Sequence, residues 1–283
     1  MISIKSPEIT TRYLESEHNK GKQIGFIPTM GAIHKGHISL IERSTRENDV
    51  TVCSIFVNPK QFNEQKDLVH YPKPLAKDME MLINAGVDLL FIPEVIGVYP
   101  ADFNDADIDM DGLDHHIEGE HRPGHFQGVA KVVRRLFDII KPTRAYFGQK
   151  DFQQTVVVRK LIQQFHPQTE LVVCPIIRED SGLAFSSRNE RLTSGERANA
   201  AFIFKSLQLL KSDLGHMDLS SALEKARLFI ESHDGTSIDY LEAVDGYTMK
   251  VVRSMEEAEF IVVVTVVNYG GVRLLDNLYL KHS

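Results

Sequence analysis

Short apolar runs alternate with helical patterns over the first two thirds of the chain, and this alternation limits the possible folds more than any other feature. QIGFIP at 23–28 and RAYFG at 144–148 have the length and the bordering turn residues of buried strands. Between them, FQGVAKVVRRLFDII at 126–140 places apolar residues at the helical i, i+3, i+4, i+7 spacing. Further strands are predicted at 50–57, 88–93 and 170–176, and further helices at 37–48, 74–86 and 151–165. We therefore expect an α/β fold with a Rossmann-like, doubly wound parallel sheet.

The pattern changes in the last third of the chain. Thr193 and Glu196 have capping-box spacing before an alanine- and leucine-rich helix, and LSSALEKARLFIESH at 219–233 predicts another helix. Three strand-like runs follow, separated by turn residues, at 238–244, 259–267 and 271–280. We therefore expect one domain of residues 1–176 and a second, smaller α+β domain of residues 177–283.

Composition and charge narrow the class of function. A formal net charge of −7 gives no field that would hold nucleic acid or an anionic membrane non-specifically, so a small-molecule site is expected. The start, MISIKSPEIT, lacks an apolar signal-peptide core, and the apolar run at 260–267 is too short to span a bilayer. Cys53 and Cys174 lie in β-branched segments where a reduced thiol packs as a small apolar group. We expect a cytoplasmic protein without disulfides.

Four unusual polar stretches follow predicted strands or lie between the two predicted domains. They are PTMGAIHKGH at 28–37, FVNPKQF at 56–62, FGQKD at 147–151 and AFSSRNER at 184–191. In an open α/β sheet, the carboxyl ends of the strands line the ligand crevice. These stretches are therefore the candidate binding segments.

PTMGAIHKGH runs from a predicted strand through a glycine-containing turn into a helix. Such a turn presents free backbone N–H groups and the positive end of the helix dipole, which suit a phosphate. His34 and His37 add donors that can follow charge as it develops on a phosphoryl oxygen, as nucleotidyl transfer requires. The alternative is a zinc pair, although no HExxH glutamate and no third ligand at a standard spacing accompany the two histidines. Phosphate binding is the favoured interpretation.

The other stretches carry weaker signals. Lys150 can reach a phosphate and Asp151 can accept from a ribose hydroxyl, although adjacent Lys and Asp residues most often form a solvated surface pair. Residues 186–188 suit a loop that closes over phosphates, and the alternative is an ordinary turn before the next helix. The amides of Gln61 and Gln154 can each bind a hydroxyl or a carboxylate, although most glutamines do not.

Residues 107–118, DIDMDGLDHHIE, match the calcium-loop pattern D-x-D-x-D-G-x₅-E in full. A calcium loop needs a helix on either side, whereas prolines and glycines flank this segment at Pro100, Gly119, Pro123 and Gly124. Ala106, Ile108 and Met110 alternate as in a half-buried strand. We therefore expect no calcium site here, and no zinc site among the nearby residues His115, His116, His121 and His125.

Taken together, these stretches resemble the pantoate–β-alanine ligase family of the HIGH-motif nucleotidyltransferase superfamily, from FIPTMGAIHKGH to the carboxyl end. The most specific parts, in the family's order and spacing, are PTMGAIHKGH, FVNPKQF, RPGHFQGVAKVV, FGQKDFQQ and GLAFSSRN. The resemblance implies an ATP-dependent ligase that adenylates (R)-pantoate and lets β-alanine attack the adenylate, giving (R)-pantothenate, AMP and pyrophosphate. It also implies Mg²⁺ with ATP, a homodimer, and a lid function for residues 177–283.

The resemblance also assigns residues. The catalytic residues that it implies are His34, His37 and Lys150. It also implies that Gln61 and Gln154 bind pantoate and that Gln61 contacts β-alanine. The ATP-binding residues that it implies are Met30, Gly31, Ala32, Ile33, His34, Lys35, Gly36, His37, Gly148, Gln149, Lys150, Asp151, Ile177, Phe185, Ser186, Ser187 and Arg188. Asp78 is the implied magnesium ligand.

Three residues depart from the family's usual pattern, namely Gln149 for Glu, Lys73 for Arg, and Phe185 for Met or Leu. None removes a group that the reaction requires. Gln149 leaves no carboxylate beside Lys150, and Lys73 lacks the bidentate fork of arginine. A metal-dependent hydrolase built on the histidines and a non-enzymatic nucleotide-binding module are the other interpretations.

Overall fold

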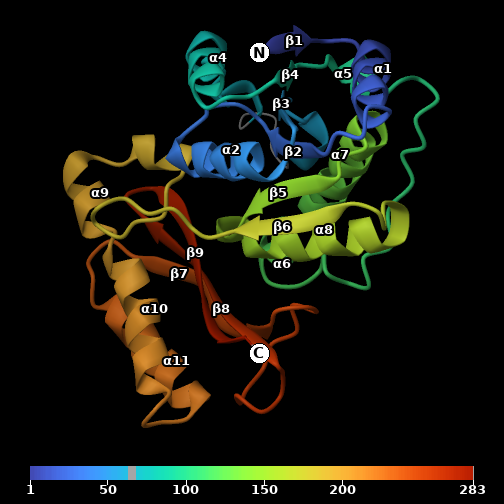
Figure 1. Ribbon diagram of the computed structural model, residues 1–283. Coiled ribbons are helices and arrows are strands. Elements are labelled where there is room, and N and C mark those ends of the chain that lie inside the picture. Colours follow the sequence, from blue (N-terminus) through green and yellow to red (C-terminus); the bar gives the residue numbers. More distant parts are fainter. Residues whose placement is uncertain (63–67, 283) are drawn as a thin grey trace. The chain divides into compact units, whose positions relative to one another are not determined.

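The computed structural model describes residues 1–62 and 68–282 and divides the chain into two compact units (Figure 1). The first unit comprises Met1–Gly148 and Val157–Cys174, and the second comprises Gln149–Val156 and the chain from Pro175 onward. The division passes through helix α8 (Phe152–Phe165). Among the described residues, no helix has both the length and the apolar character needed to cross a bilayer.

The first unit is built on a parallel six-stranded sheet, as the alternating pattern predicts. Its strands are β1 (Ile2–Ile4), β2 (Ile24–Thr29), β3 (Val50–Ile55), β4 (Leu89–Phe91), β5 (Arg144–Gly148) and β6 (Glu170–Cys174). They lie in the order β1-β4-β3-β2-β5-β6, so the chain winds outward in one direction from β2 and in the other direction from β5. The sheet therefore has its topological switch point between β2 and β5, where ligands bind in folds of this kind.

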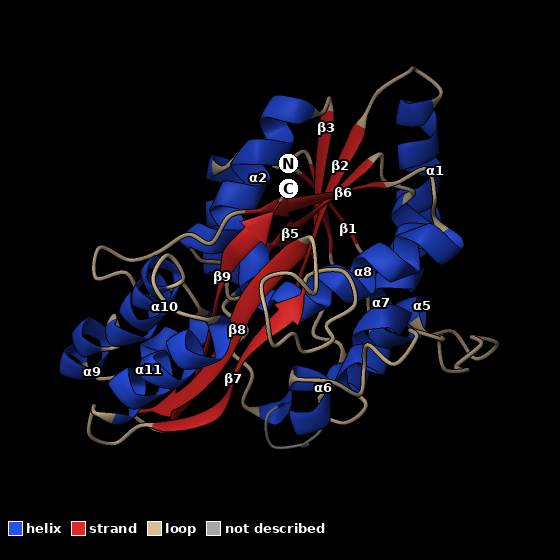
Figure 2. Ribbon diagram, turned by 90° about the horizontal axis from the view of Figure 1, so that it is seen from below, coloured by secondary structure: helices blue, strands red, loops and turns tan. Residues whose placement is uncertain are grey.

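Helices cover both faces of this sheet (Figure 2), and the packing of the β2 side chains explains why. Ile27 belongs to a buried cluster with Leu40 and Ile41 of α2, whereas the neighbouring Phe26 meets Phe137 of α7 edge to face. Successive strand residues point to opposite faces, so a fully apolar strand needs a helix on each side. The helices with described bounds that lie wholly within this unit are α1 (Pro7–His18), α2 (Lys35–Glu47), α4 (Leu75–Asn84), α5 (Val95–Val98), α6 (Glu118–His121) and α7 (His125–Ile140).

The sequence prediction for this unit omitted two elements and contained one strand that the structure lacks. The short strand β1 and the helix α1 were not expected, because three strand residues and a helix of low amphipathicity leave little periodic signal. The strand expected around Ile108 and Met110 is wrong, although both side chains are buried. The backbone of Ile108 bonds instead to the side chain of Gln127, whose amide donates to its carbonyl and accepts from its N–H, each at 3.0 Å.

The second unit is the expected α+β arrangement. Its antiparallel sheet has the order β7-β8-β9, formed by β7 (Ser237–Asp245), β8 (Phe260–Tyr269) and β9 (Val272–His282). The predicted turn between β8 and β9 contains Gly270 and Gly271, both with positive φ, as a tight hairpin requires. The helices α10 (Phe202–Asp213) and α11 (Leu219–Glu231) bury their apolar residues against this sheet.

The capping box at Thr193 and Glu196 is confirmed, since each residue's side chain accepts the other's backbone N–H. The single helix expected after it is wrong, because the structure has α9 (Ser194–Asn199) followed by α10. The N–H of Ile203 bonds to the carbonyl of Ala200 with i→i−3 spacing, so the chain tightens into a turn between the two helices.

Candidate active site

The predicted phosphate turn follows β2 at the switch point. Gly31 and Ala32 both have positive φ, 83° and 52°, which reverses the chain between the strand and α2. The Thr29 hydroxyl secures the turn, since it accepts the Gly31 N–H at 3.1 Å and donates to the Ser54 carbonyl at 2.7 Å. The strand–turn–helix context predicted for PTMGAIHKGH is therefore present.

Asp78, in the first turn of α4, holds this same turn from outside. Its carboxylate is 1% exposed and accepts the N–H groups of Ala32 and Ile33, each at 2.8 Å. Two of the N–H groups expected to be free for phosphate are therefore occupied by the protein's own carboxylate. A Cβ at Gly31 would lie 3.0 Å from the same carboxylate, so glycine permits this close approach.

Asp78, the implied magnesium ligand, serves in this structure as a hydrogen-bond acceptor for the turn. Both of its carboxylate oxygens face N–H donors, and no group of three His, Cys, Asp or Glu in the described part of the chain is arranged to hold a metal ion. The assignment of Asp78 to Mg²⁺ stays a prediction, whereas the contacts make it an anchor of the turn.

His34 and His37 form a reciprocal cap at the start of α2. The Nδ1 atom of His34 accepts the Gly36 N–H at 3.1 Å, and the Nδ1 atom of His37 accepts the His34 N–H at 3.4 Å. Their ring centroids lie 4.0 Å apart. Because each Nδ1 acts as an acceptor, the proton of each neutral ring is on Nε2. The cap therefore fixes the position and tautomer of both imidazoles.

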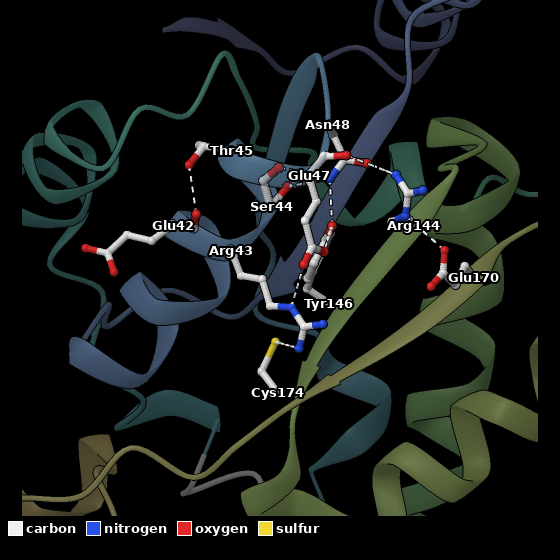
Figure 3. Close-up of polar contacts among 10 residues, drawn as sticks. All are labelled: Glu42, Arg43, Ser44, Thr45, Glu47, Asn48, Arg144, Tyr146, Glu170 and Cys174. Atoms are coloured by element: carbon white, nitrogen blue, oxygen red, sulfur yellow. Dashed lines mark hydrogen bonds and ion pairs between the residues drawn. The ribbon is translucent and has the colours of Figure 1, made fainter.

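The carboxyl end of α2 is fastened to the sheet by a polar seam, drawn in Figure 3. The buried Tyr146 hydroxyl of β5 donates to Glu47 Oε2 at 2.9 Å and accepts from Asn48 Nδ2 at 2.7 Å. Arg43 Nε donates to the other Glu47 oxygen at 2.9 Å, and Arg144 donates to Asn48 Oδ1 at 3.2 Å. Burial raises the pKa of Tyr146 to about 12. The phenol is therefore neutral and donates a hydrogen bond at physiological pH.

Gly25 of β2 lets this end of α2 approach the sheet. A Cβ at that position would lie 2.1 Å from Ser44 Oγ and 2.5 Å from Asn48 Nδ2. Ser44 Oγ also lies 2.9 Å from the Thr51 hydroxyl of β3. The helix that begins with the two histidines is therefore seated by polar contacts at its far end as well as by Leu40 and Ile41.

Gln61 lies next to the phosphate turn, because its Nε2 atom contacts Met30 Sδ at 2.8 Å. It belongs to the 3₁₀ helix η1 (Pro59–Gln61), which is held by Asn58, a residue that sequence reasoning missed. Asn58 is 1% exposed; its Nδ2 donates to Gln61 Oε1 at 3.2 Å and to the Gly128 carbonyl at 3.0 Å. Its Oδ1 accepts from the Tyr99 hydroxyl at 2.9 Å.

Residues of the motif RPGHFQGV, at 122–129, pack against η1. A Cβ at Gly128 would lie 2.2 Å from the Lys60 carbonyl, so this glycine allows α7 to pack against η1. His125 Nδ1 donates to the Gln61 carbonyl at 3.0 Å, and its Nε2 lies 3.2 Å from Arg122 Nη1. The histidine thus supports the Gln61 backbone. Its single signal in the sequence was its place in the family motif.

In the second unit, Gln149–Asp151 form the 3₁₀ helix η2, which directly follows β5 in the chain. Lys150 Nζ lies 3.4 Å from Asp151 Oδ1, which is the surface-pair contact that sequence reasoning kept open, although the Lys150 side chain is 17% exposed. Gln154 lies half-buried in the first turn of α8.

The predicted ATP-binding residues Ile177 and Phe185–Arg188 lie in the second unit. The Phe185 N–H donates to the Ile177 carbonyl at 3.0 Å. Ser186 Oγ accepts the Arg188 N–H at 3.2 Å and caps the 3₁₀ helix η3 (Ser187–Arg191). The buried Asn189 donates to Glu179 Oε1 at 2.9 Å and to the Ala184 carbonyl at 3.0 Å. The predicted loop residues therefore lie together on one internally bonded segment.

The calcium-like segment 107–118 has other contacts. Asp107 pairs with Lys131 Nζ at 2.8 Å, Asp111 pairs with Lys160, and Asp114 accepts from Gln127 Nε2 at 2.9 Å. These carboxylates point to partners on α7 and α8 rather than to a common centre.

The chain matches known proteins over nearly all of its length. The model of the pantoate–β-alanine ligase family matches residues 3–279. A pantothenate synthetase from Cytophaga hutchinsonii is 44% identical over 280 residues, which cover 98% of this chain and 99% of that one. A pantothenate synthetase from Bacteroides thetaiotaomicron is 43% identical over 262 residues, with 93% of each chain covered. These matches confirm the resemblance drawn from the motifs.

Solved structures agree with the sequence matches. The pantothenate synthetase of Thermus thermophilus has a TM-score of 0.91 and 37% identity, covering 99% of this chain and 100% of that one. The pantoate–β-alanine ligase of Francisella tularensis, complexed with β,γ-ATP and β-alanine, has a TM-score of 0.79 and 34% identity, covering 100% and 99%. With a parallel sheet that carries a histidine-capped turn at its switch point, this chain belongs to the pantoate–β-alanine ligase family.

Proposed function

We propose that this chain is an ATP-dependent ligase that condenses (R)-pantoate with β-alanine to (R)-pantothenate, through a pantoyl adenylate, in coenzyme A biosynthesis. The observation that carries the proposal is the reciprocal histidine cap of α2, which presents two imidazoles of fixed tautomer at the switch point in a chain of this family. The ATP and β-alanine bound by the Francisella tularensis relative support the same two substrates here.

The first half-reaction activates a carboxylate, which is a poor electrophile. A carboxylate oxygen of pantoate attacks the α-phosphorus of ATP, the bond to the bridging oxygen breaks, and pyrophosphate leaves with its electron pair. His34, His37 and Lys150 stabilise the negative charge that develops on the phosphate oxygens. The His34 and His37 donors are in place before substrate arrives, because the cap of α2 holds both rings.

The second half-reaction forms the amide. The amine of β-alanine attacks the acyl carbon of the adenylate, AMP leaves with the bonding electrons, and the new ammonium loses a proton. The enzyme forms no covalent intermediate, so binding and orientation carry the rate. This agrees with the cysteines, since both are buried and burial raises the pKa of the Cys53 thiol to about 12.

Pantoate binding is proposed for the amides of Gln61 and Gln154, and a β-alanine contact for Gln61. Asn58 supports the Gln61 assignment, because it holds the Gln61 oxygen and so orients the amide nitrogen. ATP is proposed to bind residues 30–37 and 148–151, the backbone of Ile177, and residues 185–188. Mg²⁺ bound with ATP would neutralise charge on the phosphates, and Asp78 is the residue proposed to hold it.

The remaining parts of the proposal concern the whole protein. The C-terminal unit is proposed to act as a lid through its loop at 185–188, and the chain is proposed to be a cytoplasmic homodimer. These assignments rest on family membership.

Exchange of labelled pyrophosphate into ATP tests the adenylation directly. We expect exchange that requires (R)-pantoate and proceeds without β-alanine, because adenylation is reversible before the amine attacks. Exchange with another carboxylic acid, and none with pantoate, would reassign the substrate. A hydrolase would release phosphate without exchange, and a nucleotide-binding module would do neither.

A further inference from the structure

Two neighbouring residues of β9, Asp276 and Asn277, are buried polar groups for which the mechanism has no role. They are 5% and 1% exposed. Asn277 Nδ2 donates to the carbonyls of Gln149 at 2.9 Å and Lys150 at 3.0 Å. Its Oδ1 accepts from the Gln149 side chain at 2.9 Å. One asparagine therefore makes three hydrogen bonds to the turn that carries Lys150.

The turn depends on such contacts, because η2 comprises three residues and a single 3₁₀ turn cannot satisfy its own carbonyls. The Asn277 amide replaces the missing backbone partners and restricts the direction in which Lys150 leaves the chain. A lysine contributes to phosphoryl transfer as a point charge on a flexible stem, so its effect depends on where its backbone is held.

The unusual Gln149 also acquires a role in this arrangement. Its amide nitrogen donates to Asn277 Oδ1, while both hydrogens of Asn277 Nδ2 bond to backbone carbonyls. A carboxylate at position 149 has no hydrogen to donate in this geometry. In this chain, the glutamine completes the contact with Asn277.

In the same unit, Asp276 holds Arg178, which lies at the start of the segment that leads to Ser186–Arg188. It accepts two hydrogen bonds from the Arg178 guanidinium, at 2.6 and 2.8 Å. Arg178 lies 3.4 Å from the centroid of Phe204 and donates to the Gly182 carbonyl at 3.1 Å, while its backbone pairs with Ala184. Burial raises the pKa of Asp276, and the Arg178 guanidinium opposes that rise.

We infer that Asp276 and Asn277 are positioning residues for adenylation: Asn277 aims Lys150, and Asp276, through Arg178, fixes the backbone bridge between Arg178 and Ala184 that leads into Ser186–Arg188. The inference rests on the proposed function and extends it, since neither residue touches substrate in the mechanism. Asp276 Oδ1 also accepts the Asn277 N–H at 2.8 Å, so the two residues support each other.

A double-mutant cycle between Asn277 and Lys150 tests the inference by pyrophosphate exchange. Asn277→Ala should lower the maximal exchange rate about 10- to 100-fold, as expected when a catalytic group is misplaced. It should leave the KM for pantoate within about twofold, because Asn277 acts on the transition state through Lys150. In the Lys150→Ala background, Asn277→Ala should cost less than about twofold, because the group that it positions is already gone.

Asn268→Ala is the matched control, since Asn268 bonds to Asp239 on the neighbouring strand and should leave exchange unchanged. If Asn277→Ala does not fold, Gln149→Ala replaces it, because that change removes a single hydrogen bond to Asn277. Equal losses in both backgrounds, or wild-type exchange in a folded variant, would overturn the inference. A wild-type protein without exchange would instead overturn the proposed function.

Discussion

His34 and His37 use their Nδ1 atoms to cap the start of α2, and this determines what each ring offers to a substrate. A histidine that accepts a backbone N–H through Nδ1 carries its proton on Nε2 and is a hydrogen-bond donor there. The same arrangement argues against zinc binding through Nδ1, which is already occupied in both rings. The acceptor role of Nδ1 therefore favours phosphate binding over zinc binding for His34 and His37.

His37→Gln tests the phosphate role. Glutamine keeps an acceptor and a donor of similar reach but loses the imidazole's capacity for positive charge, so pantoate-dependent pyrophosphate exchange should fall roughly 10²- to 10³-fold. The reaction of supplied pantoyl adenylate with β-alanine should suffer much less, because no pyrophosphate leaves in that step.

The control is His216→Gln, at an exposed position in the second unit, which should leave both half-reactions unchanged. Metal analysis provides the opposing outcome. Near-stoichiometric zinc in the purified protein, lost in both His34→Gln and His37→Gln, would replace the phosphate role by a metal site.

At the scale of elements, α2 carries a narrow apolar stripe that is supplemented by a half-buried polar seam around the buried Tyr146 hydroxyl. Its buried residues are Leu40, Ile41 and Ser44, and the Tyr146 hydroxyl bonds to both Glu47 and Asn48 beyond them. The buried Tyr146 hydroxyl favours one arrangement of the helix, because a shifted helix would leave that hydroxyl without its two partners. We attribute the placement of the histidine cap in part to this seam.

Tyr146→Phe removes the hydroxyl and keeps the ring. Burial raises the Tyr146 pKa from 10.0 to about 12, so the folded state holds the phenolic proton more tightly than the unfolded state does. The contribution of Tyr146 to the free energy of unfolding is therefore complete below pH about 10 and is lost as the pH rises through about 12. At pH about 8, the free energy of unfolding of the wild type should exceed that of the variant by about 1 kcal/mol, and the difference should shrink toward pH about 11.

Urea unfolding of both proteins across this pH range measures the difference. Tyr247→Phe, at a tyrosine that is 54% exposed, is the control and should follow the wild type at every pH. A difference between wild type and Tyr146→Phe that grows with pH would contradict the assigned direction of the pKa shift.

At the scale of the whole molecule, the segment 107–118 ties distant parts of the first unit together. Asp107 pairs with Lys131 of α7, and Asp111 pairs with Lys160 of α8. Calcium would have to displace these lysines and gather carboxylates that point to different helices. Millimolar Ca²⁺ should therefore leave the melting temperature unchanged, whereas a true site would raise it by mass action.

Differential scanning calorimetry with calcium and with a chelator makes this comparison, and magnesium at equal ionic strength is the control. A rise in melting temperature that is specific to calcium and is abolished by Glu118→Gln would establish the site that the sequence pattern suggests.

The sequence by itself determined the features that local periodicity encodes. The apolar alternation predicted the parallel sheet and the helix at 126–140, and the three final strand runs predicted the antiparallel sheet, because strand and helix spacings are visible within about ten residues. The ordered motifs identified the family and the candidate residues, since each motif is a short contiguous stretch. The weakly patterned elements β1 and α1 were not predicted from the sequence, and neither was the break between α9 and α10.

Tertiary structure alone decided how the candidate residues are held. Asp78 occupies N–H groups that the turn alone would offer to a ligand, 46 and 45 residues away along the chain. Asn277 completes the Lys150 turn across 127 residues, and Tyr146 fastens α2 across 98 residues. A single sequence carries no local trace of such pairs, because a hydrogen bond between distant residues depends on where folding brings their backbones. The sequence motifs thus indicate the candidate residues, and tertiary contacts determine how each of their side chains is oriented.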